Sequence, residues 1–153
     1  MKTLDCGLTW KSAARGIMTN QEIFDKVVRH LVAQGKPAFE DESCKYLTAS
    51  GEKCAAGCLL PEVLPEGFED PEGFSTTTNN YSWDEVCLSY PEFREIGSGP
   101  FILKIQSAHD RGANSSFWRE LWYQRMLVLA EDACVDNAVL LELATPEWRS
   151  LTL

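Results

Sequence analysis

The clearest pattern of apolar and polar positions in this chain lies in residues 20–34. Two neighbouring rows of apolar side chains each repeat every four residues there: Ile23, Val27 and Leu31, and Phe24, Val28 and Val32. This spacing predicts a helix with one wide apolar face. Thr19 and Glu22 form a capping box at the start of this helix, and Gly35 followed by Pro37 marks its end.

Similar signals predict further helical segments in the second half of the chain. A capping box formed by Ser82 and Glu85 opens the first of them, and Pro100 suits the first turn of the second. An aromatic-rich apolar pattern defines the third, and Thr145 before Pro146 is a start signal for the last. The predicted segments are 83–89, 100–110, 117–134, 139–143 and a short closing helix after Thr145.

A weaker pattern of strand type follows the first helix. Residues 44–48 and 53–58 are predicted to form the two strands of a hairpin that turns at Ser50-Gly51. Gly57 within the second strand indicates a bulge or the close approach of another element. Residues 61–81 are rich in proline and glycine and are predicted to form a long loop. The expected fold is therefore α+β, a mainly helical single domain with one small β-hairpin.

Length and apolar content suggest how this fold is organised. A chain of 153 residues corresponds to about one domain. Residues 1–17 lack a clear period, so we expect an N-terminal extension there and a single globular domain over 18–153. No continuous apolar run suits a secretory signal or a membrane span. We therefore expect a cytosolic protein whose six cysteines are reduced thiols.

The negative charge of the chain is unevenly distributed. The net charge is −9, and no Lys or Arg occurs between Lys53 and Arg94. The acidic residues of that interval are Glu62, Glu66, Glu69, Asp70, Glu72, Asp84, Glu85 and Glu92. Such a balance disfavours a direct nucleic-acid binder, which needs a basic patch. It permits a basic protein partner or mimicry of nucleic acid, and the simpler alternative is that the charge serves solubility.

The segment 51–61 is the least ordinary local sequence, because two cysteines, two alanines and a glycine occur together in it. Small residues in a row indicate that another part of the protein comes close to this backbone. We expect its companion to be the segment 103–110, which ends in His109 and Asp110.

These two segments contain the candidate catalytic residues. Cys54 or Cys58 would be the nucleophile and His109 the base, with Asp110 or Gln106 as a helper. The same thiols and His109, joined by Cys44 or Cys87, would be a weak zinc candidate, and we expect neither a metal nor a cofactor. The alternative is that the cysteines are small buried hydrophobic residues.

Aromatic and polar side chains supply the candidate binding residues. Trp118 and Trp122 lie four residues apart and would stack on a ligand base or a partner peptide; the alternative is core packing. His30 lies off the apolar rows, so we expect it to face solvent. The candidate ligand-binding or partner-binding residues are Gln106, His109, Trp118, Trp122, Glu62, Glu66, Glu69, Asp70 and Glu72.

Three runs of this chain resemble a group of small uncharacterised proteins encoded by phages, prophages and bacteria. The runs are Met18-Thr19-Asn20-Gln21-Glu22-Ile23-Phe24, Gly51-x-Lys53-Cys54-Ala55-x-Gly57-Cys58-Leu59-Leu60-Pro61 and Ile105-Gln106-x-x-His109-Asp110. The resemblance covers roughly residues 18–130. It implies a setting, a phage or mobile element in a bacterial cytosol. It carries over no functional residue.

By analogy with small acidic phage proteins that lack catalytic motifs, we expect a non-enzymatic binder that inhibits a host enzyme or defence component. The expected partner is a host protein, and a small-molecule ligand is a further possibility. One alternative is a small Cys/His-dependent or metal-dependent enzyme acting on a nucleotide-like ligand. Another alternative is a minor virion or structural protein.

Overall fold

The computed structural model of the chain describes residues 17–63, 69–70, 73–74 and 82–149. The described α-helices are α2 (Asn20–Gln34), α4 (Trp83–Ser89), α5 (Gly99–Asp110), α6 (Trp118–Ala133), α7 (Ala138–Leu143) and α8 (Pro146–Arg149). Short 3₁₀ helices η1 (Gly57–Leu59) and η2 (Pro91–Glu95) accompany them. The strands are β1 (Phe39–Glu40), β2 (Ser43–Cys44), β3 (Glu69–Asp70) and β4 (Gly73–Phe74). None of the described helices combines the length and apolar character needed to cross a membrane.

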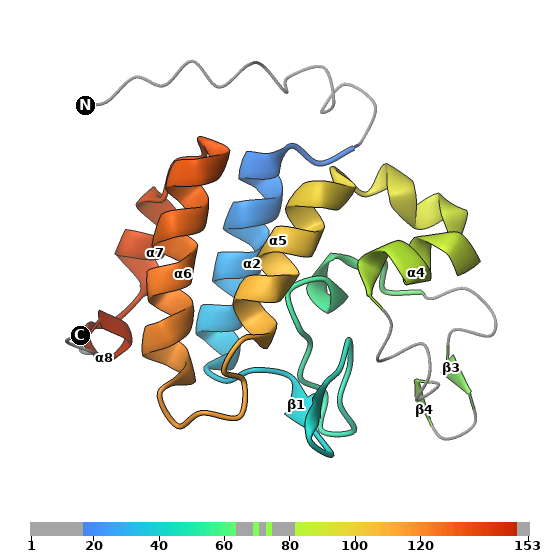
Figure 1. The fold of residues 1–153 in the computed structure, drawn as a ribbon, viewed down its shortest axis with the longest axis horizontal. Helices are drawn as coiled ribbons and strands as arrows, with labels where there is room; N and C mark the ends of the chain where they lie inside the picture. Colours follow the sequence, from blue (N-terminus) through green and yellow to red (C-terminus); the bar gives the residue numbers. More distant parts are fainter. Residues whose placement is uncertain (1–16, 64–68, 71–72, 75–81, 150–153) are drawn as a thin grey trace.

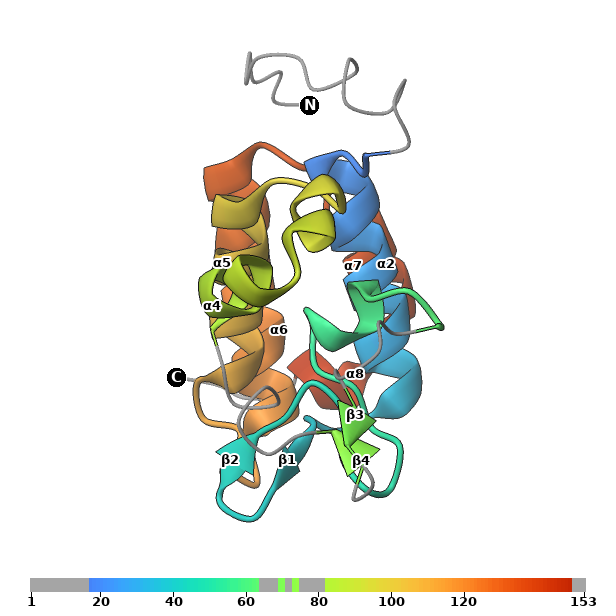
Figure 2. The ribbon, with the colours of Figure 1, turned by 90° about the vertical axis from the view of Figure 1, so that its right-hand side faces the viewer.

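The four helices α2, α5, α6 and α7 form the body of the molecule (Figures 1 and 2). Helix α2 contacts α7 and α5, and α5 contacts α6. Helix α8 packs against α6, while α4 and η2 pack together beside α5. The β1–β2 hairpin lies at one end of this bundle (Figure 1). The mainly helical α+β fold expected from the sequence is therefore confirmed.

Helix α2 has the boundaries that its apolar rows predicted. The Thr19 side chain accepts a hydrogen bond from the backbone N–H of Glu22, and Glu22 reaches back to the backbone of Thr19. Gly35 ends the helix in the left-handed region at φ 77°, where glycine has no steric cost. The apolar face is fully buried in the core, and its buried residues are Ile23, Phe24, Val27, Val28 and Leu31.

The predicted hairpin over 44–48 and 53–58 is wrong in its position. The paired strands are β1 and β2, with Phe39 opposite Cys44, and they turn at Asp41 and Glu42. Both turn residues have positive φ, 53° and 63°, as a two-residue hairpin turn of type I′ requires. Of the predicted pair, one isolated bridge between Leu47 and Lys53 remains. Residues 57–59 form η1 instead of a strand.

Gly57 lies against the backbone of Tyr46. A Cβ built on Gly57 would lie 2.1 Å from the carbonyl oxygen of Tyr46. The two backbones are therefore too close for any side chain at this position. The expectation of a close approach at Gly57 is confirmed. The residues that make this approach form the 3₁₀ helix η1 and not a paired β-strand.

The predicted long loop over 61–81 contains two strands that the sequence pattern missed. The strands β3 and β4 pair antiparallel, with Glu69 opposite Phe74. The predicted extension over residues 1–17 lies outside the described residues, apart from residue 17. The boundary proposed between the extension and the domain therefore stays a prediction.

Candidate functional site

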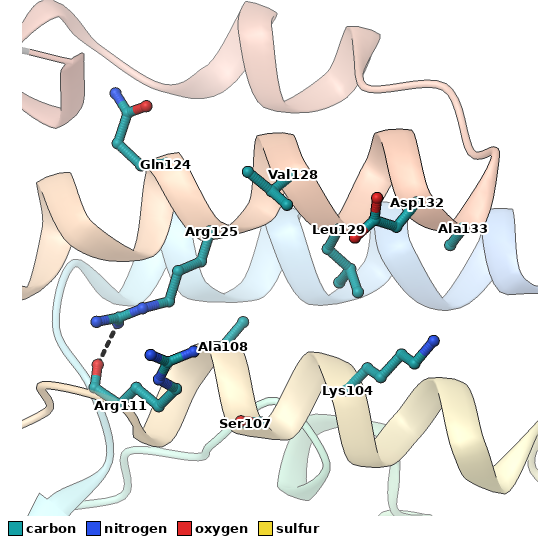
Figure 3. Close-up of a pocket in the computed structure, with 10 residues that line it drawn as sticks. All are labelled: Lys104, Ser107, Ala108, Arg111, Gln124, Arg125, Val128, Leu129, Asp132 and Ala133. Carbon is teal, nitrogen blue, oxygen red and sulfur yellow. Dashed lines mark hydrogen bonds between the residues drawn. The ribbon is translucent and has the colours of Figure 1, made fainter.

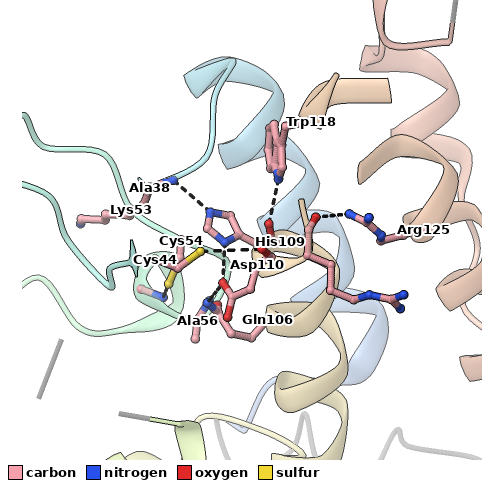
Figure 4. A network of polar contacts seen from close by, with 12 residues as sticks. Ala38, Cys44, Lys53, Cys54, Ala56, Gln106, His109, Asp110, Trp118 and Arg125 are labelled. Carbon is pink, nitrogen blue, oxygen red and sulfur yellow. Dashed lines mark hydrogen bonds and ion pairs between the residues drawn. The ribbon is translucent and has the colours of Figure 1, made fainter. Parts of the chain in front are cut away.

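His109 lies in the last turn of α5 and is completely buried. Its Nε2 atom lies 3.0 Å from the backbone nitrogen of Ala38 (Figure 4). A backbone N–H can only donate, so Nε2 must be the acceptor. The ring proton then resides on Nδ1, which lies 2.8 Å from Oδ1 of Asp110 and donates to it. Both ring nitrogens are thus engaged inside the protein.

This arrangement limits the chemistry that His109 can perform. A general base needs a free lone pair within reach of its substrate, and the lone pair of Nε2 is taken by the N–H of Ala38. Burial of the ring also separates it from solvent. The predicted Cys–His arrangement therefore lacks an accessible base in this conformation.

The ligand atoms of Cys44, His109 and Asp110 lie within 4.8 Å of one another. The structure thus places Cys44, rather than Cys54 or Cys58, in this candidate metal cluster. A metal on Nδ1 of His109 would have to replace the proton that Nδ1 carries while Nε2 still accepts from Ala38, which requires an imidazolate. The donor set therefore does not fit a metal in this tautomer.

Gln106 connects α5 to the segment of small residues. Its Oε1 accepts from the backbone N–H of Ala56 at 2.7 Å, and its Nε2 donates to Oδ1 of Asp110 at 2.7 Å (Figure 4). Together with His109, one helical turn of α5 thus holds the backbone at Ala38 and Ala56. The structure therefore brings the two predicted segments, 51–61 and 103–110, together. A hydrogen bond from the backbone of Ala56 to the side chain of Gln106 joins them.

The two candidate tryptophans are core residues. Trp118 and Trp122 are almost completely buried, and their rings stack with centroids 5.7 Å apart. Nε1 of Trp118 donates to the carbonyl oxygen of His109 at 2.7 Å, and Trp148 contacts both indoles edge-on. Neither indole face is open to a ligand, so the core-packing alternative describes their position.

The cysteines of segment 51–61 are buried thiols with internal partners. The backbone N–H of Gly57 donates to Sγ of Cys54 at 3.2 Å, and Sγ of Cys58 donates to the carbonyl oxygen of Ala55 at 3.1 Å. Burial raises the pKa of Cys54 well above its ordinary value and that of Cys58 to about 12. Both groups are therefore protonated at neutral pH and are poor nucleophiles.

Among the five cysteines of the described residues, the expectation of reduced thiols holds for four and fails for one. The free cysteines are Cys44, Cys54, Cys58 and Cys87. Cys134, the residue that ends α6, is disulfide-bonded, which contradicts the expectation for this position.

His30 is half-buried rather than facing solvent, so the prediction for this residue is wrong. Its Nε2 lies 3.0 Å from the carbonyl oxygen of Lys53. Gln34 makes two hydrogen bonds to the same residue, donating to the carbonyl oxygen and accepting from the backbone N–H of Lys53. Burial lowers the pKa of His30 and outweighs the opposing effect of its hydrogen bond to Lys53. Side chains of His30 and Gln34, on one turn of α2, therefore hold the backbone at Lys53, near the start of segment 51–61.

The acidic candidate surface lies mostly beyond the described residues. Glu62 is exposed, and Glu66 and Glu72 lie outside the described residues. Glu69 and Asp70 belong to β3, and their side chains also fall outside the description. Binding through this stretch stays a prediction.

Sequence reasoning missed a cleft of about 480 Å³ between α5 and α6 (Figure 3). Lys104 and Arg111 reach it from α5 and its C-terminal end, and Arg125 and Asp132 reach it from α6. The charged lining thus consists of three cations and one acid, in a protein whose net charge is −9. A signal existed in the sequence, because two helices joined by a short loop pack antiparallel and bring Arg111 opposite Arg125.

The residues that line a second pocket, of about 410 Å³, include Cys44, Gln106 and Asp110. Its charged lining consists of one cation, Lys45, and two acids, Glu85 and Asp110. The α5–α6 cleft therefore differs from this pocket in having an excess of positive charge.

Comparison with known proteins found no match to this chain among protein families, curated proteins or solved structures.

Proposed function

We propose that this chain is a non-enzymatic binding protein, of phage or mobile-element type, that acts in a bacterial cytosol by occupying a host enzyme or defence component. The carrying observation is that the candidate catalytic groups are used for internal contacts. His109 holds Ala38 and Asp110, and Gln106 holds Ala56 and Asp110. Cys54 and Cys58 are buried thiols of raised pKa.

The α5–α6 cleft supplies the positive part of this proposal. Its volume of about 480 Å³ falls within the range of sites that hold ligands or side chains of a partner. Val128 on its rim exposes 60% of its surface, and no ion pair of the described residues involves Lys104, Arg111 or Arg125. Exposed apolar surface beside uncompensated charge is typical of a recognition surface.

The charge of the remaining surface would affect the orientation in which the partner docks, and the cleft would bind it. With a net charge of −9, the protein repels acidic macromolecules over most orientations. A cleft of opposite sign then favours one docking orientation for a partner that has a local acidic group. The resemblance to phage-encoded proteins supplies the expected setting, and the partner is expected to be a host protein.

Affinity capture from a bacterial lysate tests the proposal. The tagged wild-type chain is compared with Arg111→Glu in the cleft and with Arg29→Glu on the exposed face of α2, a substitution of the same charge change outside the cleft. We expect one stoichiometric host protein with the wild type and with Arg29→Glu, identified by native mass spectrometry. Loss of activity of that host enzyme on complex formation would support inhibition.

Two results would contradict the proposal. Turnover of a small molecule by the purified chain, lost in Cys54→Ala or His109→Ala variants that still fold, would favour the enzyme alternative. Recovery of the chain in purified phage particles at fixed copy number, with no host protein captured, would favour the virion alternative.

A further inference from the structure

We propose that the α5–α6 cleft binds a carboxylate of the partner protein, carried by an acidic residue that stands beside an apolar residue. This inference rests on the proposed function and names the chemistry that the same cleft recognises. The carboxylate would lie between Arg111 and Arg125, and the apolar neighbour would lie on Val128 and Leu129.

The two arginines form an uncompensated pair of positive charges at one end of the cleft (Figure 3). An Nη of Arg125 donates to the carbonyl oxygen of Arg111, which orients the guanidinium of Arg125 toward the end of α5. Burial lowers the pKa of Arg125, and the positive charge of Arg111 lowers it further. The folded protein therefore holds two like charges near each other at a cost, which an incoming anion would relieve.

Hydrogen-bonding capacity at this end is also left unused. A guanidinium has five N–H donors in a fixed fork, and Arg125 directs one of its hydrogen bonds to the carbonyl oxygen of Arg111. Among the hydrogen bonds and ion pairs of the described residues, the side chain of Arg111 has no partner. A planar carboxylate matches such forks with two parallel hydrogen bonds.

The floor of the cleft is apolar and fits a neighbouring apolar side chain. Ala108, Leu129 and Ala133 line it, and the exposed Val128 stands at its edge. Covering Val128 removes apolar surface from water, which is favourable at about 25 cal/mol per Å². An acidic residue next to an apolar residue therefore matches the order of lining groups along the cleft.

The lining residues favour a single carboxylate over a nucleotide. The ten residues that line the cleft all lie in the described part of the chain and include no aromatic side chain on which a base would stack. Asp132 adds a negative charge to the same cleft, which disfavours a polyphosphate.

The test uses NMR titration of the full chain labelled with ¹⁵N and ¹³C. The probes are two short acetylated and amidated peptides that contain Leu and differ at the next position, Glu in one and Gln in the other. We expect the Glu peptide to shift the side-chain Nε–H signals of Arg111 and Arg125 and the methyl signals of Val128, with Kd on the order of 1 mM. The Gln peptide should bind at least about tenfold more weakly than the Glu peptide.

Matched variants separate the cleft from general charge. Arg111→Glu should abolish the shifts, and the neutral Arg111→Gln should weaken binding about tenfold, while Arg29→Glu should leave binding unchanged. Amide spectra of each variant report whether the fold is intact. Because the wild type alone discriminates Glu from Gln, the inference stays falsifiable even if an Arg111 variant does not fold.

Three outcomes would overturn the inference. They are equal binding of the Glu and Gln peptides, no shift at Arg111 and Arg125, and shifts produced by adenosine monophosphate or inorganic phosphate but not by the Glu peptide. Failure of the proposed function has a different signature, since no host protein would be captured although the Glu peptide still binds the cleft. Equal capture of a host protein by the wild type and Arg111→Glu would contradict the role of the cleft in binding but not the proposed function.

Discussion

The backbone N–H of Ala38 and Nε2 of His109 form a buried hydrogen bond of 3.0 Å across 71 residues of sequence. The bond joins the segment just before β1 to the end of α5. It also decides the tautomer of His109, because the N–H can act only as a donor. A histidine that sequence patterns mark as a candidate base is thereby a structural residue.

Replacing His109 should destabilise the fold strongly. In His109→Ala the N–H of Ala38 loses its acceptor, and a cavity opens beside the ring of Trp118. Losing a buried hydrogen-bond partner and a packed ring together should cost about 3–5 kcal/mol of unfolding free energy. Urea unfolding followed by tryptophan fluorescence measures the loss. Ser107→Ala, at an exposed position of the same helix, is the control and should change stability by less than about 0.5 kcal/mol.

Gly57→Ala should prevent the normal packing of segment 51–61 against Tyr46. The added Cβ would meet the carbonyl oxygen of Tyr46 at 2.1 Å, and a backbone atom cannot rotate away as a side chain does. We expect a loss of more than about 3 kcal/mol or failure to fold. Gly99→Ala is the matched control, because nothing lies within 4 Å of a Cβ there and Gly99 begins α5. That variant should be neutral or gain about 0.5–1 kcal/mol, and equal losses in both variants would refute the packing argument.

Local sequence signals predicted the helices well. The capping boxes at Thr19 and Ser82 each involve residues only three apart, so the boundaries of α2 and α4 could be predicted without tertiary information. The glycine at position 57 likewise predicted the close approach of another backbone. The aromatic pattern placed α6 correctly, although this helix begins at Trp118 without a side-chain cap.

Features that depend on distant residues could not be predicted in the same way. The strands β1 and β2 contain two residues each, too few for a period of two to be visible. The partner of His109 is a backbone N–H, which leaves no trace in the identity of Ala38. His30 lies off the apolar rows of α2 but contacts Lys53, which the helical pattern alone cannot show.

The buried thiols should react slowly in the native protein. Burial raises the pKa of Cys54 and Cys58, so the reactive thiolate is scarce at pH 7.5. We expect iodoacetamide to label these two cysteines at least about tenfold more slowly in native buffer than in 6 M guanidinium chloride, as measured by peptide mass spectrometry. Cys54→Ala and Cys58→Ala identify the labelled peptides. Rapid native labelling of either residue would contradict the structural role and favour a nucleophile.

His30 should make the stability of the fold depend on pH. Because burial lowers its pKa in the folded state, the unfolded chain binds a proton first as the pH falls below about 6.5. Unfolding then becomes easier, so the contribution of His30 is fully present above pH 6.5 and is lost as the pH falls through the lowered pKa of the folded state. In His30→Gln the amide N–H₂ can still donate to the carbonyl oxygen of Lys53, and the titration is removed.

Urea unfolding at pH 7.5, 6.5, 5.5 and 5.0 should therefore show the wild type losing more stability than His30→Gln as the pH falls. The remaining titratable groups are common to both proteins, so the difference between the two profiles reports His30. Parallel pH profiles for the two proteins would show that His30 titrates as it does in the unfolded chain and that its contact with Lys53 contributes no proton linkage.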